Sequence, residues 1–396
     1  MKIRLLVVAI FAGISTFASA EAAGVQFYGV IDAGLAHFTG LAPSSGAPGQ
    51  TASSTGLSGG IQTPDLLGVK GSEELGGGTS AVFDVETGFC GVGLNQDGYV
   101  GQSSPAQTYC TGGGFMQRLA WVGLKGRFGV LKAGRMYSMA LINEANADPF
   151  GWGLTGSNGN LSLTGAGGGY NILRTNQTLE YTSPAQSGFK IIASYSFAPT
   201  SVGTVPSGSA SSSLVPRLWS LDGDYENGPV SAGIYYSRMS NEPYGVGAAG
   251  LNDGTLTLSQ IYGAYDFGFA KLSALLERAS GEYADGTTAG TSGGSNKYWL
   301  VGASIPVGAG VALASFGEAN VGVDSVLMPA SAHGNAKQYA IGYVYNLSKQ
   351  VNLYASYARI INSANTSFAV LTGTDYFAGV AGKDSSGVAL GIRDSF

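Results

Sequence analysis

The sequence predicts an all-β fold, a single antiparallel barrel of 16 strands that closes on itself and crosses a membrane. Three observations predict it: an export-type N-terminus, a long series of alternating strands whose connectors are short and long by turns, and a last strand that ends on Phe396. Successive side chains of a strand point to opposite faces, so alternation produces one apolar and one polar face. A membrane barrel needs an apolar exterior, a polar interior and an even strand number.

The N-terminus has the features of a secretory signal peptide. Lys2 and Arg4 precede an apolar run, and the small residues Ala18–Ala20 form a cleavage site. We therefore expect residues 1–20 to be removed and residues 21–396 to form one barrel domain. The alternative is a membrane anchor, but the apolar run is shorter than the roughly 20 residues that a spanning helix requires.

The composition suits a barrel. Only 11% of residues are charged, yet the chain has 64 glycines and 21 tyrosines. Aromatic residues are suited to the interfacial girdles, and glycines to tight turns and long loops. Without Lys2 and Arg4 the chain has 18 basic against 25 acidic side chains, a net charge near −7. This charge gives no electrostatic route to nucleic acid.

Sixteen segments have strand periodicity. They are 25–38, 58–71, 79–89, 115–126, 130–138, 175–183, 188–198, 218–226, 229–239, 256–266, 269–279, 296–306, 310–320, 337–347, 350–361 and 387–396. Seven short connectors alternate with the long ones, as expected when one rim carries turns and the other carries loops. A soluble sandwich would show the same alternation, so the barrel prediction depends on the export signal, the connector lengths and the terminal aromatic together.

Strand parity places a set of charged side chains on the face opposite the aromatics, which we assign to the lumen. The predicted pore-lining residues are Asp32, Asp84, Glu86, Glu180, Lys190, Asp222, Asp224 and Arg393. The same parity puts Arg118 and Arg174 inside. Trp121, Trp219 and Trp299 fall on the outward parity, and Tyr28, Tyr235 and Tyr298 on the inner one. The acids of the lumen outnumber its bases, which favours cations weakly.

The two cysteines, Cys90 and Cys110, lie in one Gly/Gln/Ser-rich connector between two predicted strands. Export to an oxidising compartment favours a disulfide that closes this loop, and two free thiols are the alternative. A metal site is not expected from two isolated cysteines. The two histidines, His37 and His333, also supply no motif for a catalytic or metal site, so we predict neither an enzyme nor a cofactor.

Several segments resemble the Gram-negative general porins, and most closely their betaproteobacterial branch. The resemblance implies a homotrimer of 16-stranded barrels in the outer membrane, with short periplasmic turns, long extracellular loops and a third loop folded inward. Each barrel would be a water-filled channel for passive diffusion of small hydrophilic solutes and ions. The segments that carry the resemblance are Val25–Leu35, Leu67–Gly78, Arg118–Gly126, Asp148–Gly151, Tyr181–Pro184, Gly302–Gly310, Ala336–Ser348, Tyr354–Asn362 and the terminal strand.

The long connector Met139–Leu173 is the candidate for the inward loop, because long loops in compact structures are usually functional or disordered. An unplugged barrel of this size would be too wide, so an inward fold would supply a size filter. An extracellular flap is the alternative. The resemblance implies wall arginines opposite acidic loop residues, and Arg118 and Arg174 match two of these positions. Arg135 could line the pore at the base of the loop or pair with a loop carboxylate. The predicted constriction comprises Arg118, Arg135, Glu144, Asp148, Phe150 and Arg174. One basic wall position of the family is Leu66 here, which weakens the positive wall.

Two other functions remain open. A substrate-specific channel would need an aromatic path, and an adhesin barrel would bind its partner through the loops. The resemblance also implies partners: two identical subunits, lipopolysaccharide and outer-membrane lipid, and the barrel-assembly machinery that recognises the Phe396 strand. Beyond the weak preference for cations, the sequence does not predict ion selectivity, pore radius, permeant solutes or voltage gating.

Overall fold

The computed structural model describes residues 24–43, 49–89, 92, 116–165, 172–197, 217–242, 254–284, 291–322, 334–371 and 378–396. The predicted signal peptide and the predicted Cys90–Cys110 bridge lie outside these residues. In the described part of the chain no helix has the length and apolar character to cross a membrane.

The described residues form antiparallel strands at all sixteen predicted places. The second place holds two short strands instead of one. The bounds are β1 Gly24–Leu41, β2 Ala52–Gly59, β3 Leu66–Gly76, β4 Thr79–Gly88, β5 Leu119–Gly126, β6 Gly129–Tyr137, β7 Arg174–Thr182, β8 Phe189–Ser196, β9 Arg217–Asn227, β10 Val230–Glu242, β11 Gly254–Asp266, β12 Lys271–Ala284, β13 Thr291–Val307, β14 Gly310–Val321, β15 Gly334–Asn346, β16 Val351–Asn362 and β17 Ser385–Ser395.

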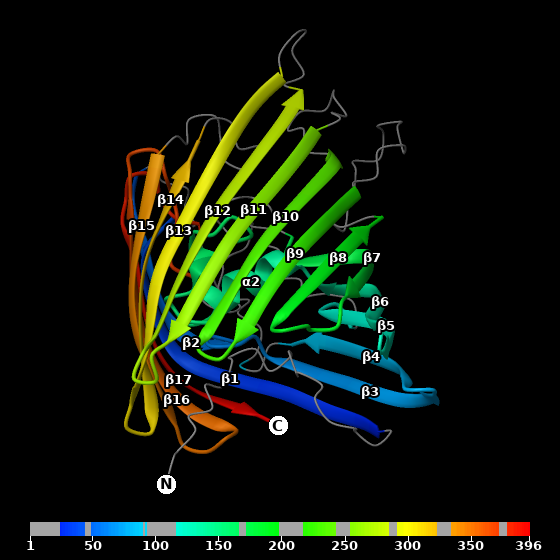
Figure 1. Cartoon of the computed structure of the whole chain (residues 1–396). Helices are drawn as coiled ribbons and strands as arrows, with labels where there is room; N and C mark the ends of the chain where they lie inside the picture. The colour runs from blue at the N-terminus through cyan, green and yellow to red at the C-terminus, as the bar shows by residue number, and fades with distance from the viewer. Residues whose placement is uncertain are drawn as a thin grey trace.

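The sheet closes into a barrel because β17 pairs with both β16 and β1. The closing register sets Val30 opposite Ser395, and Gly29 exchanges two backbone hydrogen bonds with Phe396, of 2.9 and 3.1 Å. Figure 1 shows the strands tilted around a lumen that encloses a helix. The prediction of a closed antiparallel barrel of 16 strands is confirmed.

The second strand is interrupted at its middle. β2 pairs with the C-terminal half of β1, and β3 pairs with its N-terminal half. Between β2 and β3, residues 60–65 leave the sheet. Asp32 holds this excursion: its Oδ2 accepts the backbone N–H groups of Gln62 and Thr63 at 2.6 and 2.9 Å. The Tyr354 hydroxyl donates to the other oxygen of Asp32 at 2.5 Å. The periodicity of 58–71 did not predict this break.

The two faces of the barrel follow strand parity. Large apolar side chains such as Phe27 of β1 and Leu276 of β12 are exposed on the outside, while the acids Asp32 and Glu277 of the same two strands are turned inward and buried. This is the arrangement that lipid outside and water inside require. One parity prediction is wrong. Trp121 pairs with the inward Asp84, so it lies on the lumen face while its neighbour Val122 lies outside.

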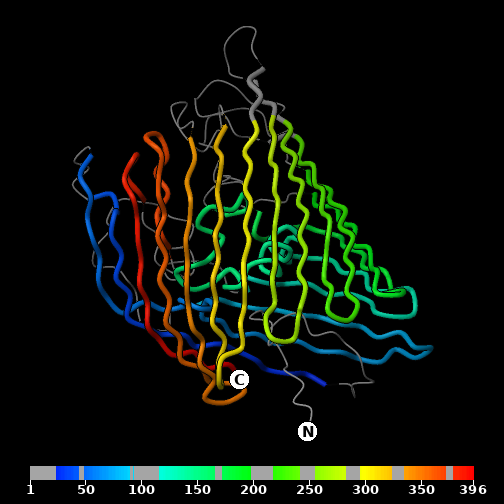
Figure 2. The backbone as a smooth tube through the Cα atoms, turned by 60° about the vertical axis from the view of Figure 1, so that its left-hand side comes forward, coloured from blue at the N-terminus to red at the C-terminus, as the bar shows by residue number. Residues whose placement is uncertain are grey.

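The described parts of the third long connector, residues 138–165 and 172–173, fold into the barrel; we call them the inward loop. It begins with helix α2 (Met139–Ala147), capped by the Ser138 hydroxyl, which accepts the N–H of Leu141 at 3.2 Å. A short 3-10 turn, η1 (Asn158–Asn160), follows. Figure 2 shows the teal segment of this loop enclosed by the strands, as predicted.

Candidate functional site

The helix of the inward loop packs against one wall of the lumen, formed by β9 to β12. Asn143 Nδ2 donates to Asp222 of β9 at 2.7 Å, and Gln260 of β11 donates to the carbonyl of Ala140 at 3.2 Å. Ser273 of β12 donates to the carbonyl of Ala147 at 2.6 Å. Contacts at both ends of the helix fix its position against this wall.

The rest of the loop continues onto the neighbouring wall. Asn160 donates to Gln338 of β15 at 2.9 Å, and the hydroxyls of Thr155 and Ser356 of β16 lie 2.9 Å apart. The Leu154 N–H donates to the carbonyl of Ile61 in the β2–β3 excursion at 2.7 Å. The described part of the loop therefore lies along β9–β16 and contacts the interrupted strand at Leu154.

Two wall glycines allow the loop to approach this closely. A Cβ at Gly302 of β13 would lie 2.2 Å from Cγ of Pro149, and a Cβ at Gly342 of β15 would lie 2.9 Å from Cε1 of Phe150. Both distances are shorter than side chains tolerate. The segment Asp148–Gly151 thus fits the wall through glycines on two strands.

Asp148 organises the turn that follows α2. Its carboxylate accepts the backbone N–H groups of Phe150, Trp152 and Asn158 at 3.0, 3.1 and 2.9 Å. Burial raises the pKa of Asp148 to about 7, and nearby Glu144 also raises it, while the three N–H donors oppose this shift. Asp148 is therefore the acceptor around which the loop folds, and its side chain is not open to the lumen.

The other two loop residues predicted for the constriction are also turned into the structure. Glu144 is fully buried and accepts Trp152 Nε1 at 2.6 Å, Ser162 Oγ at 2.8 Å and the Thr164 N–H at 3.1 Å. Phe150 is fully buried against the wall. The loop narrows the lumen by its bulk, and its acidic groups are occupied by loop donors. The exposed residue of α2 is the neutral Asn146.

The inner face of β3 to β8 lies opposite the loop. We call this face the open wall, and we include in it Tyr28 of β1 and Asp224 of β9, which lie at its two edges. At its centre Arg118 Nε is 2.5 Å from Glu86 Oε1, and Arg118 Nη2 donates to the Tyr137 hydroxyl at 2.6 Å. Arg174 Nη2 donates to the same hydroxyl at 3.2 Å, with its guanidinium 4.6 Å from the Tyr137 ring. Two predicted arginines therefore meet at one tyrosine.

Arg135 lies beside this cluster at a β-bulge. The β6–β7 register shifts between Gly134 and Met136, and Gln177 on β7 has a positive φ of 47°. Bulges redirect side chains next to functional sites. Arg135 Nε donates to the Gln117 carbonyl at 2.5 Å, and its Nη1 donates to Asn176. Parity along β7 predicts the inward placement of Arg174, whereas parity along β6 from the inward Lys132 does not predict that of Tyr137.

On β1, β3 and β4, acidic and basic side chains of the open wall alternate around a tyrosine. The Tyr28 hydroxyl donates to Asp84 at 2.7 Å and to Glu86 at 3.2 Å, and Lys70 Nζ lies 5.3 Å from the centre of the Tyr28 ring. The pairing of Lys70 with Asp84 puts both on the inner face.

On β5 to β9, two lysines form ion pairs with inner-face acids. Lys132 Nζ is 3.0 Å from Glu180 and lies 5.1 Å from the centre of the Trp121 ring. Lys190 Nζ is 3.1 Å from Asp224. The lysine side chains keep about a quarter to a third of their surface exposed, so their charge remains accessible to solutes.

The contacts of the open wall join five basic and four acidic side chains. The basic ones are Lys70, Arg118, Lys132, Arg174 and Lys190, and the acidic ones are Asp84, Glu86, Glu180 and Asp224. The other predicted pore-lining residues lie elsewhere. Asp32 is buried under the β2–β3 excursion with Arg393 opposite it, and Asp222 is buried against α2.

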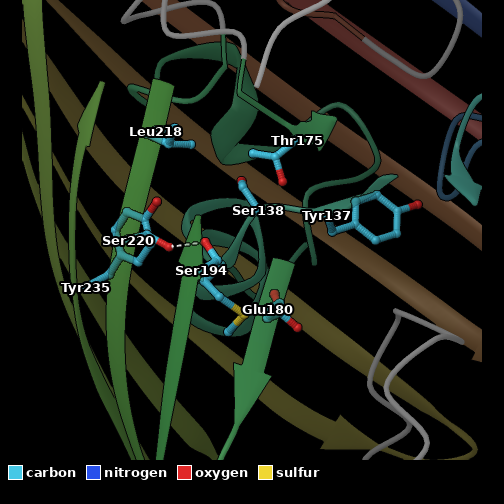
Figure 3. A pocket seen from close by; sticks show the side chains of 9 residues that line it. Tyr137, Ser138, Thr175, Glu180, Ser194, Leu218, Ser220 and Tyr235 are labelled. Carbon is cyan, nitrogen blue, oxygen red and sulfur yellow. Dashed lines mark hydrogen bonds between the residues drawn. The ribbon is translucent and has the colours of Figure 1, made fainter. Parts of the chain in front are cut away.

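A small polar recess lies where α2 begins, between the loop and β7–β10 (Figure 3). It is lined by Tyr137, Ser138, Thr175, Glu180 and other residues, and its hydroxyl groups include Ser194 and Ser220, whose oxygens lie 2.7 Å apart. Tyr137 belongs both to this recess and to the arginine cluster. The recess therefore connects the start of the loop to the open wall.

Sequence reasoning missed Lys70, Lys132 and Trp121. Each lies on the inner face, and each could have been assigned from its outward neighbours. Leu67 of β3, Leu131 of β6 and Val122 of β5 are exposed to the outside, which puts residues of opposite parity inside. The signal was present in the alternation, but residues were assigned to the lumen mainly by charge and by segment.

Comparison with known proteins agrees with this geometry. The signature of the Gram-negative porin family matches residues 6–365. The chain is 28% identical to outer membrane porin protein 32 of Delftia acidovorans and 29% identical to an outer membrane porin of Bordetella pertussis, in alignments that cover 100% of each chain. The solved anion-selective porin from Comamonas acidovorans superposes with a TM-score of 0.74 at 26% identity, covering 95% of this chain and 100% of that one.

A barrel with a polar lumen, an apolar exterior and an inward loop has the geometry of a diffusion channel. The family match spans most of the chain, and both full-length relatives are outer membrane porins. The chain belongs to the Gram-negative porin family, and it is an outer-membrane channel for passive diffusion of small hydrophilic solutes and ions.

Proposed function

We propose that this porin passes small anions in preference to cations, through an aperture between the inward loop and the open wall. The uneven distribution of charge carries the proposal. Bases outnumber acids in the contacts of the open wall, while Glu144 and Asp148 of the loop are buried and occupied by loop donors. Charge at the narrowest region sets the selectivity of a channel.

This proposal reverses the weak cation preference expected from the sequence, for a physical reason. The sequence-based count included Asp32 and Asp222, which the fold buries against the excursion and the loop. It omitted Lys70 and Lys132, which lie on the open wall. The anion-selective porin from Comamonas acidovorans, which this chain resembles at 26% identity, supports the same sign.

Within this aperture we assign separate roles to the arginines. Arg174 supplies positive charge at the centre of the open wall, where its Nη2 donates to the Tyr137 hydroxyl. The charge of Arg118 is balanced by Glu86 at 2.5 Å, so we assign Arg118 chiefly to the position of Tyr137. Arg135 is held beside them by a carbonyl and an amide oxygen.

The reversal potential of single channels in a salt gradient tests the proposal. With potassium chloride on both sides of a planar bilayer, a chloride-permeable channel gives the opposite sign of potential to a potassium-permeable one. A permeability ratio that favours potassium would contradict the proposal. The barrel would remain a diffusion channel in either case.

The family membership also supports three finer proposals. We propose that three copies assemble, that residues 1–20 are cleaved, and that lipopolysaccharide and the assembly machinery contact the barrel. Conductance that closes in three equal steps would support the trimer. Edman sequencing that begins at Glu21 would support the cleavage site.

A substrate-specific channel has less support. Trp121 does lie in the lumen, contrary to the prediction, but the ammonium group of Lys132 lies 5.1 Å from its ring centre. Tyr28 is likewise adjacent to Lys70. Lysines therefore cover these two rings, and an aromatic path for a sugar would need uncovered ring faces.

A further inference from the structure

Two buried glutamates meet where α2 contacts the barrel wall. Glu277 lies on the inner face of β12, and Glu144 lies in the middle of α2. Their side chains are in hydrogen-bonding contact, and their exposed fractions are 4% and 0%. Two carboxylates cannot hydrogen-bond to each other without a proton, because each would offer only acceptors.

Neither glutamate is balanced by a base. The ion pairs among the described residues involve other acids: Glu86, Glu180, Asp224 and Asp384. Two like charges at one buried site are strongly unfavourable, so such a pair holds one proton between them. The donors around the pair indicate which group carries it.

Glu144 is surrounded by donors. Trp152 Nε1, Ser162 Oγ and the Thr164 N–H all donate to it, at 2.6, 2.8 and 3.1 Å. Glu277 accepts two hydrogen bonds, from Gln260 Nε2 at 2.7 Å and the Leu163 N–H at 3.0 Å. Donors stabilise an ionised carboxylate, so the larger set favours the charge on Glu144 and the proton on Glu277.

We propose that Glu277 is a positioning residue, a neutral carboxylic acid that donates a hydrogen bond to ionised Glu144 and holds the inward loop on the wall. This goes beyond the proposed function, because it concerns what keeps the loop in place whichever ion the aperture prefers. The contact joins β12 directly to α2, and the Leu163 N–H attaches the far side of the loop to the same side chain.

The proposal makes the loop sensitive to pH. The titratable groups around the pair are Tyr298 of β13 and Asp148 of the loop, both acidic. Loss of the proton from Glu277 would leave two adjacent carboxylates without a counter charge. The proton therefore stabilises the attached loop, and alkaline pH removes that stabilisation.

Infrared spectroscopy of trimers labelled with ¹³C-glutamate tests the proton directly. A neutral carboxylic acid has a carbonyl stretch that an ionised carboxylate lacks, and at about pH 7 ordinary glutamates are ionised. We expect a neutral-glutamate band in the wild-type protein and its loss in Glu277→Gln. The proposal is overturned if wild-type protein shows no such band, a result that does not depend on any variant folding.

Hydrogen exchange of the α2 amides tests the positioning role. As the pH is raised and the proton is lost, we expect wild-type protection, corrected for intrinsic exchange, to fall by up to about tenfold per pH unit. Glu277→Gln keeps a donor towards Glu144 at every pH, so its profile should be flat. Glu318→Gln, on β14 next to Asn335, is the matched control and should follow the wild type. Coincident wild-type and Glu277→Gln profiles would overturn the proposal.

Discussion

Replacing Arg174 with glutamine should weaken the preference of the channel for anions. The side chain is half-buried on the open wall, and its Nη2 donates to the Tyr137 hydroxyl at 3.2 Å. Glutamine is shorter than arginine and does not restore this contact, so the hydroxyl depends on its other partner. Arg118 continues to donate to Tyr137 at 2.6 Å, and its ion pair with Glu86 is untouched. The substitution therefore removes one positive charge and leaves the neighbouring contacts in place.

The size of the effect follows from Coulomb's law. An ion that passes roughly 6 Å from the guanidinium through a water-filled lumen interacts with it by about 0.7 kcal/mol. An anion loses this stabilisation and a cation loses the matching repulsion, so the permeability ratio should fall about tenfold at low ionic strength. At 0.1 M salt, screening over a Debye length of about 10 Å reduces this to roughly fourfold.

Reversal potentials of single channels, recorded at two ionic strengths, measure this change. The matched control is Arg359→Gln, since Arg359 lies on the outer face of β16 in an exposed pair with Asp384 at 2.7 Å. The control should retain the wild-type ratio. An unchanged ratio in Arg174→Gln, or an equal shift in both variants, would refute the placement of Arg174 at the aperture.

Three further changes test the loop and the closing strand. Asp148→Asn replaces one of the two oxygens that together accept three loop N–H groups with an NH2 group, at a cost of about 1–3 kcal/mol. We therefore expect noisier conductance with little change in selectivity, and a clean shift towards anions would show that Asp148 faces the lumen. Gly302→Val would place side-chain atoms where Pro149 lies, because the ideal Cβ at this position is 2.2 Å from Cγ of Pro149. The loop should therefore be displaced and the single-channel conductance should rise. Conductance equal to that of the wild type would show that the loop accommodates the valine without leaving the lumen. Deleting Phe396 removes both hydrogen bonds to Gly29 and should lower the yield of assembled protein in the outer membrane, which undiminished surface levels would contradict.

Much of the barrel could be predicted from local sequence. The alternation of apolar and polar residues identifies a strand whatever its neighbours are, and a short connector requires the two strands that it joins to pair. The predicted bounds of the fourteen consecutive strands from β4 to β17 therefore agree with the structure to within a few residues. The interruption at residues 60–65 could not be predicted in this way. It depends on Asp32 of β1 and Tyr354 of β16, which lie far from it in the chain.

The candidate site was predicted less completely than the fold. Arg118 and Arg174 were assigned to one region, and the structure brings both to Tyr137. Glu144 and Asp148 were identified as loop acids, but the donors that occupy them, such as Trp152 and Asn158, are set by the path of the loop. A residue's identity does not reveal whether its charge faces water or neighbouring backbone N–H groups.

Export, strand number and the two faces of the barrel follow from periodicity and composition, because lipid outside and water inside act on every residue of a strand alike. The sign of the charge that a passing ion meets was decided only in three dimensions. The fold buries Asp32, Asp222 and the loop carboxylates among donors, and leaves Lys70 and Lys132 on the open wall. Burial and hydrogen bonding depend on contacts between distant segments, and these contacts determine which charges still act across the lumen.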